Sequence, residues 1–185
     1  IINDVLDMSK IEAGKLELAS EIVTVQRVIA ESLRMVSERA HSRNIELVTE
    51  LSGIETGIRG DERAIKQIVL NLLSNAVKFS HDGGRVDIRA ALDPNGGLLI
   101  EVEDRGIGMS AAELERALQP FGQANTGAAR LYGGTGLGLP ITKGLVEAHH
   151  GELMIDTTPE RGTKVSVLLP PLIAGAVIVP AKALG

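Results

Sequence analysis

Four short motifs follow one another along this chain, and together they constrain its fold more than any other feature. An asparagine-containing segment comes first, and two glycine-rich segments and a proline–phenylalanine turn come after it. The motifs are Asn-Leu-Leu-Ser-Asn-Ala-Val-Lys-Phe at 71–79, Asp-Arg-Gly-Ile-Gly at 104–108, Pro-Phe-Gly-Gln at 120–123 and Gly-Gly-Thr-Gly-Leu-Gly-Leu at 133–139. Each motif alone has an ordinary explanation, so the information lies in their combination.

The composition predicts a soluble domain with an aliphatic core. The chain has 185 residues, of which 44% are hydrophobic and only 2% aromatic, enough for one domain with short extensions. The absence of cysteine excludes disulfides and thiolate metal sites. A net charge of −5 with interspersed signs argues against a nucleic-acid partner. No apolar run approaches the ~20 residues of a membrane helix, and no signal peptide is visible. We therefore expect these residues to be cytoplasmic and without membrane contact of their own, which leaves open a membrane anchor elsewhere in the parent protein.

Hydrophobic periodicity predicts both helices and strands. Apolar positions at helical spacing predict helices over residues 1–13, 25–40, 61–80, 110–118 and 137–149. Alternating positions predict strands over residues 45–51, 57–59, 86–91, 98–103, 153–156 and 164–169, with a further short strand or linker at 15–23. The pattern favours an α+β fold, a two-layer sandwich of a mixed sheet with helices on one face. The abrupt start at Ile1 indicates a piece of a longer protein.

The first motif places three polar side chains on one edge of its helix. At about 100° per residue, Asn71, Asn75 and Lys78 lie within about a 60° arc. The other side of the helix is apolar and can face the sheet. An amide oxygen can serve as a magnesium ligand without adding charge, and an ammonium group can neutralise phosphate oxygens. The alternative is a solvated helix face.

The second motif follows an alternating segment, so Asp104 is expected at the end of a strand. A carboxylate there can accept a hydrogen bond from an exocyclic amine such as adenine N6. Gly106 and Gly108 remove side chains, which lets the backbone approach a flat ring. An ordinary Asp-x-Gly turn is the alternative.

The last motif runs directly into a predicted helix. Gly133, Gly134, Gly136 and Gly138 would leave free N–H groups at a helix start, where phosphates bind. Neither a Walker A loop nor a dinucleotide-binding fingerprint fits, because no Gly-Lys-Ser/Thr follows and Leu139 stands where the fingerprint needs glycine. A flexible linker is the alternative.

The stretch between Phe121 and Gly134 has little periodicity, and we expect it to form a mobile lid. Phe121 is a candidate hydrophobic latch and Arg130 a candidate contact to a γ-phosphate. A lid that closes over nucleotide would exclude water from phosphoryl transfer.

With these motifs in place, residues 61–169 resemble the catalytic ATP-binding domain of sensor histidine kinases, in the superfamily shared with DNA gyrase. Residues 1–18 resemble the end of the second dimerisation helix and its linker. The resemblance implies a Bergerat-type fold, with ATP and Mg²⁺ between the first-motif helix and the lid. It divides the chain into residues 1–20, helix end and linker, residues 21–170, catalytic domain, and residues 171–185, a tail.

The resemblance also implies roles for individual residues. Asn75 matches the principal magnesium ligand, with Asn71 beside it, and Asp104 matches the adenine anchor. Asn71, Asn75, Lys78 and Arg130 are the expected catalytic residues. The expected nucleotide contacts come from the motifs and one late strand: Asn71, Asn75, Lys78, Phe79, Asp104, Gly106, Ile107, Gly108, Phe121, Arg130, Gly134, Thr135, Gly136, Leu137, Gly138 and Thr163.

The phospho-acceptor motif, a histidine followed by an acidic residue and then a proline, is missing from this chain. We read all four histidines as structural or surface residues: His41, His81, His149 and His150. A cation at residues 149–150, where a helix ends, would be favoured by the helix dipole. The expected function is therefore transfer of the ATP γ-phosphate to a histidine on the protein's own dimerisation domain, upstream of Ile1. The full-length protein would be a homodimer that serves a response regulator.

Two other functions remain open at this point. The first is an ATP-hydrolysing machine of the same superfamily, but such relatives carry a glutamate as general base where this chain has Asn71, and an amide cannot take the proton. The second is a nucleotide-gated module that acts only by binding partners. It is kept open because Arg130 is followed by Leu131, where many relatives carry paired arginines.

Overall fold

A computed structural model describes residues 2–54, 57–92, 95–122 and 134–171 of the chain. The helices are α1 (Ile2–Glu12), α2 (Val25–Ser42), α3 (Glu62–Phe79), α4 (Ala111–Ala117) and α6 (Gly138–Ala148). The strands are β1 (Glu21–Val23), β2 (Glu46–Ser52), β3 (Ile58–Gly60), β4 (Arg85–Leu92), β5 (Leu98–Asp104), β6 (Glu152–Thr158) and β7 (Gly162–Leu169). All the predicted helices and strands are present, with small shifts at their ends.

Five strands form one mixed sheet in the order β2-β4-β5-β7-β6. β2 and β4 are parallel, and the other neighbouring pairs are antiparallel. The parallel pair is joined through α3, whereas β4–β5 and β6–β7 are hairpins. β1 and β3 form a separate two-stranded antiparallel sheet. The mixed sheet that the sequence predicts is thus confirmed.

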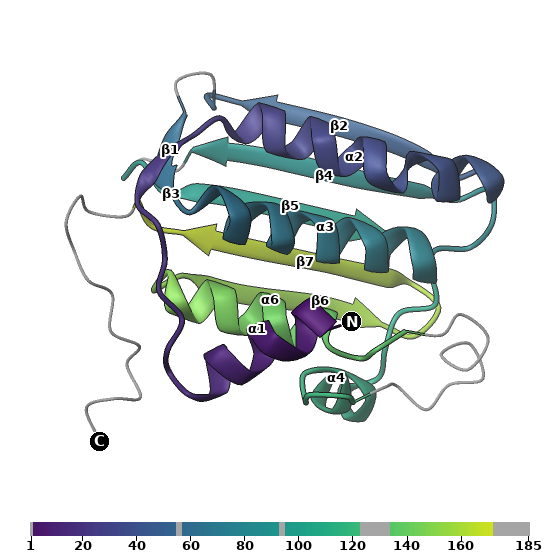
Figure 1. Ribbon diagram of the computed structural model, residues 1–185. Coiled ribbons are helices and arrows are strands. Elements are labelled where there is room, and N and C mark those ends of the chain that lie inside the picture. The colour runs from purple at the N-terminus through teal and green to yellow at the C-terminus, as the bar shows by residue number, and fades with distance from the viewer. Residues whose placement is uncertain (1, 55–56, 93–94, 123–133, 172–185) are drawn as a thin grey trace.

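Helices α2, α3 and α6 lie side by side over one face of the large sheet (Figure 1). Alternation along β5 explains why only that face is covered. Leu98, Ile100 and Val102 are buried under the helices. Glu101 and Glu103 point to the opposite face, where they pair with Lys164 and Arg89 of the neighbouring strands at 2.6 and 3.1 Å. The core therefore lies between the sheet and the three helices.

Capping side chains set where two helices begin. Asp61 accepts a hydrogen bond from the Ala64 N–H at 2.8 Å and starts α3, as its sequence predicts. Ser110 and Glu113 form a reciprocal capping box at the start of α4. The second oxygen of Asp61 accepts a hydrogen bond from the Ala19 N–H at 2.7 Å. The same carboxylate therefore starts α3 and fastens the segment that leads from α1.

Helix α1 packs against α6 (Figure 1). The contact is close because Gly144 has no side chain, and a Cβ there would lie 2.4 Å from the Ile11 side chain. Asp7 of α1 forms an ion pair with Arg63 of α3 at 3.0 Å. The division into residues 1–20, 21–170 and 171–185 remains a prediction, and residues 172–185 lie outside the described part. Among the described residues, no helix combines the length and apolar character that crossing a bilayer requires.

Candidate functional site

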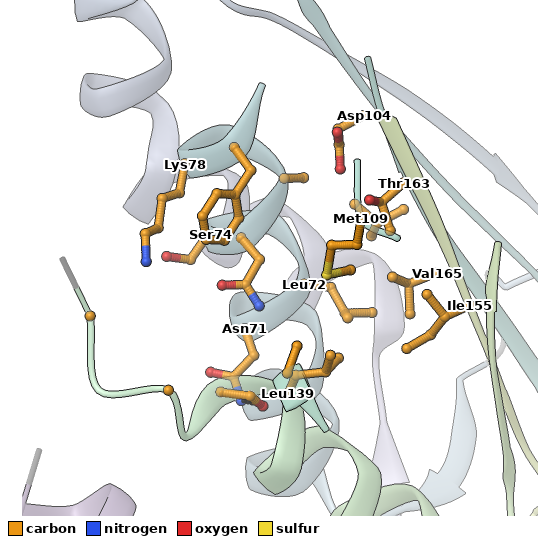
Figure 2. Close-up of a pocket in the computed structure, with 18 of the residues that line it drawn as sticks. Asn71, Leu72, Ser74, Lys78, Asp104, Met109, Leu139, Ile155, Thr163 and Val165 are labelled. Atoms are coloured by element: carbon orange, nitrogen blue, oxygen red, sulfur yellow. Dashed lines mark hydrogen bonds between the residues drawn. The ribbon is translucent and has the colours of Figure 1, made fainter. Parts of the chain in front are cut away.

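Helix α3 turns its predicted polar edge toward a cavity of about 340 Å³. Asn71, Asn75 and Lys78 all line this cavity. Ile68 and Leu73, on other sides of the helix, are fully buried in the core. Figure 2 shows Asn71, Ser74 and Lys78 of α3 on one side of the cavity and residues of the sheet on the other. The amphipathic pattern of α3 therefore orients the polar side chains into the cavity.

The Asn71 amide is held in place by α6. Its Nδ2 donates hydrogen bonds to the Gly138 carbonyl oxygen at 3.0 Å and to Thr142 Oγ1 at 3.3 Å. Thr142 is itself fully buried and donates to the same carbonyl at 2.9 Å. Because the nitrogen of the amide is used for these contacts, its oxygen is the atom left for a ligand. The orientation of Asn71 is thus determined by packing between α3 and α6.

Lys78 supplies positive charge at one end of the cavity. Its Nζ lies 4.5 Å from the centre of the Phe79 ring, a cation–π distance. Partial burial lowers the pKa of Lys78, and the positive charge of Arg39 lowers it further. A Cβ on Gly134 would lie 2.7 Å from Nζ, so the glycine at that position leaves room for the ammonium group. A negatively charged ligand would lower the free-energy cost of keeping Lys78 protonated at this end.

Asp104 ends β5 at the other end of the cavity and is only 7% exposed. Its carboxylate accepts hydrogen bonds from the backbone N–H groups of Gly106, at 2.9 Å, and Thr163. Burial outweighs these hydrogen bonds and raises the pKa of Asp104 to about 6. The group is therefore an anchored carboxylate that is costly to ionise without a donor in the cavity.

Thr157 organises the wall beside Asp104, although it belongs to none of the four motifs. Its Oγ1 accepts a hydrogen bond from the Met109 N–H at 2.9 Å and lies 2.9 Å from Thr163 Oγ1. Thr157 and Thr163 are directly paired across β6 and β7. This contact fixes the Thr163 hydroxyl, which lines the cavity, and ties the loop after β5 to the β6–β7 hairpin.

The glycines of the second motif make room chiefly for protein backbone. A Cβ on Gly106 would lie 2.1 Å from the Phe79 carbonyl oxygen, and one on Gly108 would lie 1.9 Å from the Thr158 carbonyl oxygen. Gly108 also has a positive φ of 59° and lines the cavity beside Ile107, whereas Gly106 does not line it. The close approach expected for a ligand ring at Gly106 is instead an approach of two protein segments.

The described part of the last glycine motif borders the cavity from the α6 side. Gly134, Thr135, Gly136 and Gly138 line it, and Thr135 Oγ1 accepts a hydrogen bond from the Leu137 N–H at 3.3 Å. The Leu137 side chain is fully buried in the core, so a ligand contact through that side chain is not available. The motif thus contributes backbone and one hydroxyl to the cavity.

Some predicted contacts fall elsewhere. The Phe121 side chain is 64% exposed and does not line the cavity, so the structure does not bring this latch candidate to the site. Its backbone lies close to the glycine loop, because a Cβ on Gly136 would lie 3.0 Å from the Phe121 carbonyl carbon. Arg130, Leu131 and Gly133 lie outside the described residues.

Several residues that line the cavity belong to none of the four motifs. Met109, Ile155 and Val165 form an apolar wall opposite α3 (Figure 2). Val165 could have been found, because it lies two residues after Thr163 on a strand and therefore on the same face. Ile155 becomes its neighbour only through the pairing of β6 with β7. Arg39 of α2 also lines the cavity, and no local pattern distinguishes it from other surface arginines.

None of the four histidines lines this cavity. His41, His81 and His150 are exposed, and His149 is 1% exposed. Packing works against a cation at His149, because burial lowers the pKa of this imidazole and outweighs the contact of its Nδ1 with the Leu145 carbonyl oxygen at 2.7 Å, which raises it. His149 is thus a buried structural residue at the end of α6.

A family model described as histidine kinase-, DNA gyrase B- and HSP90-like ATPase matches residues 60–173. The chain belongs to this ATPase family. The matched stretch contains every residue that lines the cavity except Asp4 and Arg39. The cavity between α3, the β5 end and the glycine motif is therefore the part of the chain that the family model covers.

Known relatives of this ATPase-family chain are histidine kinases. The cell-division control histidine kinase PdhS of Brucella anthropi is 41% identical over 179 residues, which are 92% of this chain and 17% of that protein. The chain thus spans about a sixth of the length of the curated relatives it matches. The crystal structure of full-length ShkA in complex with AMPPNP has a TM-score of 0.80 and 30% identity, over 95% of this chain and 36% of that one. A mycobacterial sensor histidine kinase, MprB, has a TM-score of 0.70 and 29% identity, over 83% of this chain and 100% of that one.

These structural relatives confirm the predicted fold class, a mixed sheet with helices on one face. The family model and the Brucella relative confirm the family resemblance that the four motifs indicate.

Proposed function

We propose that this chain is the Mg²⁺–ATP-binding catalytic domain of a histidine kinase, which transfers the ATP γ-phosphate to a histidine on the dimerisation domain of its own protein. The observation that carries the proposal is the shared cavity. It places a buried carboxylate, Asp104, at one end and the polar edge of α3, with Asn75 and Lys78, at the other. An adenine and a charged phosphate chain need these two kinds of surface in one pocket.

Each end of the cavity would bind a different part of the nucleotide. Asp104 would accept a hydrogen bond from the adenine amino group, and the apolar side chains of Ile155 and Val165 would pack against the ring. Lys78 would neutralise phosphate oxygens. The amide oxygens of Asn75 and Asn71 fit a magnesium ion, because hard cations take oxygen ligands and the phosphates supply the negative charge. The ion would supply charge neutralisation at the phosphates.

Asn71 favours phosphoryl transfer to a protein over hydrolysis. A hydrolase needs a general base to activate water, and an amide has no basic site for that proton. The Asn71 nitrogen also donates to Gly138 and Thr142, which holds the side chain as a positioning group. Catalysis would then rest on placement of the γ-phosphate and on charge neutralisation.

The partners of this reaction follow from the histidine-kinase relatives. We infer that residues 1–20 lead from a dimerisation helix, that the full-length protein is a homodimer in the cytoplasm, and that a response-regulator aspartate receives the phosphoryl group. The name of the Brucella relative, a cell-division control histidine kinase, supports this assignment of the reaction.

Two measurements test the proposal. Calorimetry with ADP and Mg²⁺ should show saturable binding to the chain, and no binding would refute the nucleotide site. Incubation with radiolabelled ATP should give no labelled histidine on the chain alone, and slow acid-labile labelling of a matching dimerisation domain added in trans, since phosphohistidine is acid-labile. Nucleotide binding without any transfer in trans would favour a module that only binds.

A further inference from the structure

Arg43 reaches from the end of α2 to the end of α3, and nothing in the four motifs includes it. Its side chain is 14% exposed. Nη1 donates hydrogen bonds to the carbonyl oxygens of Val77, at 2.6 Å, and Lys78, at 2.8 Å, and Nη2 donates to that of Ser80 at 2.7 Å. Nε donates to Asp82 at 2.7 Å. One guanidinium group therefore holds the backbone on both sides of Phe79.

The carbonyl groups of Val77 and Lys78, in the last turn of α3, need an outside partner. The last carbonyls of an α-helix have no intrahelical N–H donor, and they form the negative end of the helix dipole. A guanidinium group carries several donors in a rigid plane and stays charged, so it satisfies the carbonyls and opposes the dipole at once. A lysine could offer the charge but not the same fork of donors.

The opposite side of the same turn is held by the loop after β5. The Ile107 N–H donates to the Phe79 carbonyl oxygen at 3.2 Å, and Ser80 forms a β-bridge with Gly106. The last turn of α3 is thus clamped between Arg43 and the loop that follows Asp104. Lys78 lies inside this clamped turn and lines the nucleotide cavity.

The backbone of Arg43 is itself anchored. Its N–H donates to the Ala40 carbonyl oxygen at 3.2 Å, and its carbonyl oxygen accepts from the Gly83 N–H at 2.9 Å. The guanidinium group therefore starts from a fixed point, at the junction of α2 with the loop before β4. A side chain anchored at both ends transmits a defined position to its partner.

We propose that Arg43 is a positioning residue for the nucleotide site, which holds the last turn of α3 so that Lys78 meets the phosphates of the bound nucleotide. This inference rests on the proposed function of the cavity. Arg43 does not line the cavity, so any effect on nucleotide must pass through the α3 backbone. The alternative is that Arg43 contributes to stability alone.

The decisive experiment compares Arg43→Met, Lys78→Met and the double variant, with Mg²⁺–ADP and adenosine as ligands, well below the melting temperature of each variant. Arg43→Met should weaken ADP binding by about tenfold or more, the scale for a misplaced binding group. Adenosine, which has no phosphate, should lose less than about threefold. The double variant should bind ADP no more weakly than Lys78→Met, because residues that act through one another are not additive.

Conservative and control variants sharpen the test. Arg43→Lys keeps the charge and should recover part of the ADP affinity, and it serves as the test variant if Arg43→Met does not fold. Asp82→Ala removes only one partner of Arg43, the Asp82 carboxylate, whose side chain is 75% exposed. This variant should leave ADP binding unchanged.

Unchanged ADP affinity in both folded Arg43 variants would overturn the inference, as would additive losses in the double variant or an equal loss for adenosine. If the unaltered chain binds no ADP, the proposed function fails instead, so the two failures are distinguishable.

Discussion

The two ends of the cavity hold their polar groups in different ways. At the Asp104 end, the carboxylate is bound by the backbone N–H groups of Gly106 and Thr163, and a threonine pair ties the wall together. At the Lys78 end, the charged group rests on an aromatic ring, and partial burial, together with the nearby cation Arg39, lowers its pKa. The first end is organised by the protein alone, whereas the second concentrates positive charge that an anionic ligand would balance.

Shape and charge are therefore supplied to the cavity by separate parts of the fold. The Asp104 end, where we propose that adenine binds, depends on strand pairing, because Thr157, Thr163 and Val165 are brought together by the β6–β7 hairpin. The Lys78 end, where we propose that the phosphates bind, depends on one edge of α3 and on the contacts that hold this helix. Substitutions at the two ends should therefore have different dependence on phosphate, magnesium, pH and salt.

Asn75→Ala should produce the largest loss of ligand affinity, and the loss should be confined to the end of the cavity that we propose binds phosphate. The side chain is half-buried on the polar edge of α3, so little core packing is lost. We expect magnesium-dependent ADP binding to be abolished while adenosine binding remains. Calorimetry with and without Mg²⁺ measures this, and Gln67→Ala, on the same helix but outside the cavity, is the control. Loss of the circular dichroism spectrum in Asn75→Ala would mean that Asn75 is structural.

Asp104→Asn should weaken binding at the end of the cavity that we propose binds adenine. We expect weaker binding of both ADP and adenosine by about 1–3 kcal/mol, the scale of a hydrogen bond to a charged group. Magnesium dependence should persist, in contrast with Asn75→Ala. Titration of both ligands by calorimetry tests the assignment, and an unchanged affinity for adenosine would remove Asp104 as the adenine anchor.

Acidification should lower the affinity for adenosine at the Asp104 end of the cavity. The pKa of Asp104 is raised from an ordinary 3.8 to about 6, so protonation removes the anionic acceptor as the pH falls through about 6. The loss of adenosine affinity should not exceed that of Asp104→Asn, and that variant should lack the pH step. Affinity that stays constant in the unaltered chain from pH 7.5 to about 5 would contradict this.

The stability of the fold should move the other way with pH. A carboxyl whose folded pKa lies above its unfolded value stabilises the fold when protonated. The contribution of Asp104 is therefore fully present below pH 3.8 and is lost as the pH rises through about 6. Comparison of the unaltered chain with Asp104→Asn by thermal unfolding across this range isolates the contribution from that of other carboxylates.

Arg39→Gln should produce the smallest effect, at the phosphate end. Arg39 is exposed and lines the cavity, and exposed charge interactions contribute only about 0–1 kcal/mol. We expect a modest loss of ADP affinity that disappears at high salt and is absent for adenosine. Arg34→Gln, an exposed arginine on the same helix that does not line the cavity, is the matched control. Equal losses in both variants would indicate a general charge effect.

Sequence reasoning succeeded where the cause is local. Asp61 and Ser110 start their helices through hydrogen bonds to residues three positions ahead. The helical period of α3 separates its polar edge from its buried side, whatever it packs against. Such features depend on neighbours in the chain, so the residue order alone determines them.

Sequence reasoning failed where backbone segments distant along the chain meet. Gly106 was expected to face a ligand ring, but it makes room for the Phe79 carbonyl group. The helix dipole was expected to favour a cation at residues 149–150, but packing buries His149 and lowers its pKa. In each case the side chain is ordinary in its local context, and its surroundings come from another element.

The order of residues by itself determined the elements of this protein, the family to which it belongs and the polar edge of α3. Only the tertiary structure decided that Thr157 supports Thr163, that Ile155 and Arg39 border the cavity, and that Arg43 holds the end of α3. The physical reason is that periodicity and capping act over a few residues, whereas a binding cavity is defined by side chains and carbonyl groups whose contacts exist only after the sheet has paired and the helices have packed onto it.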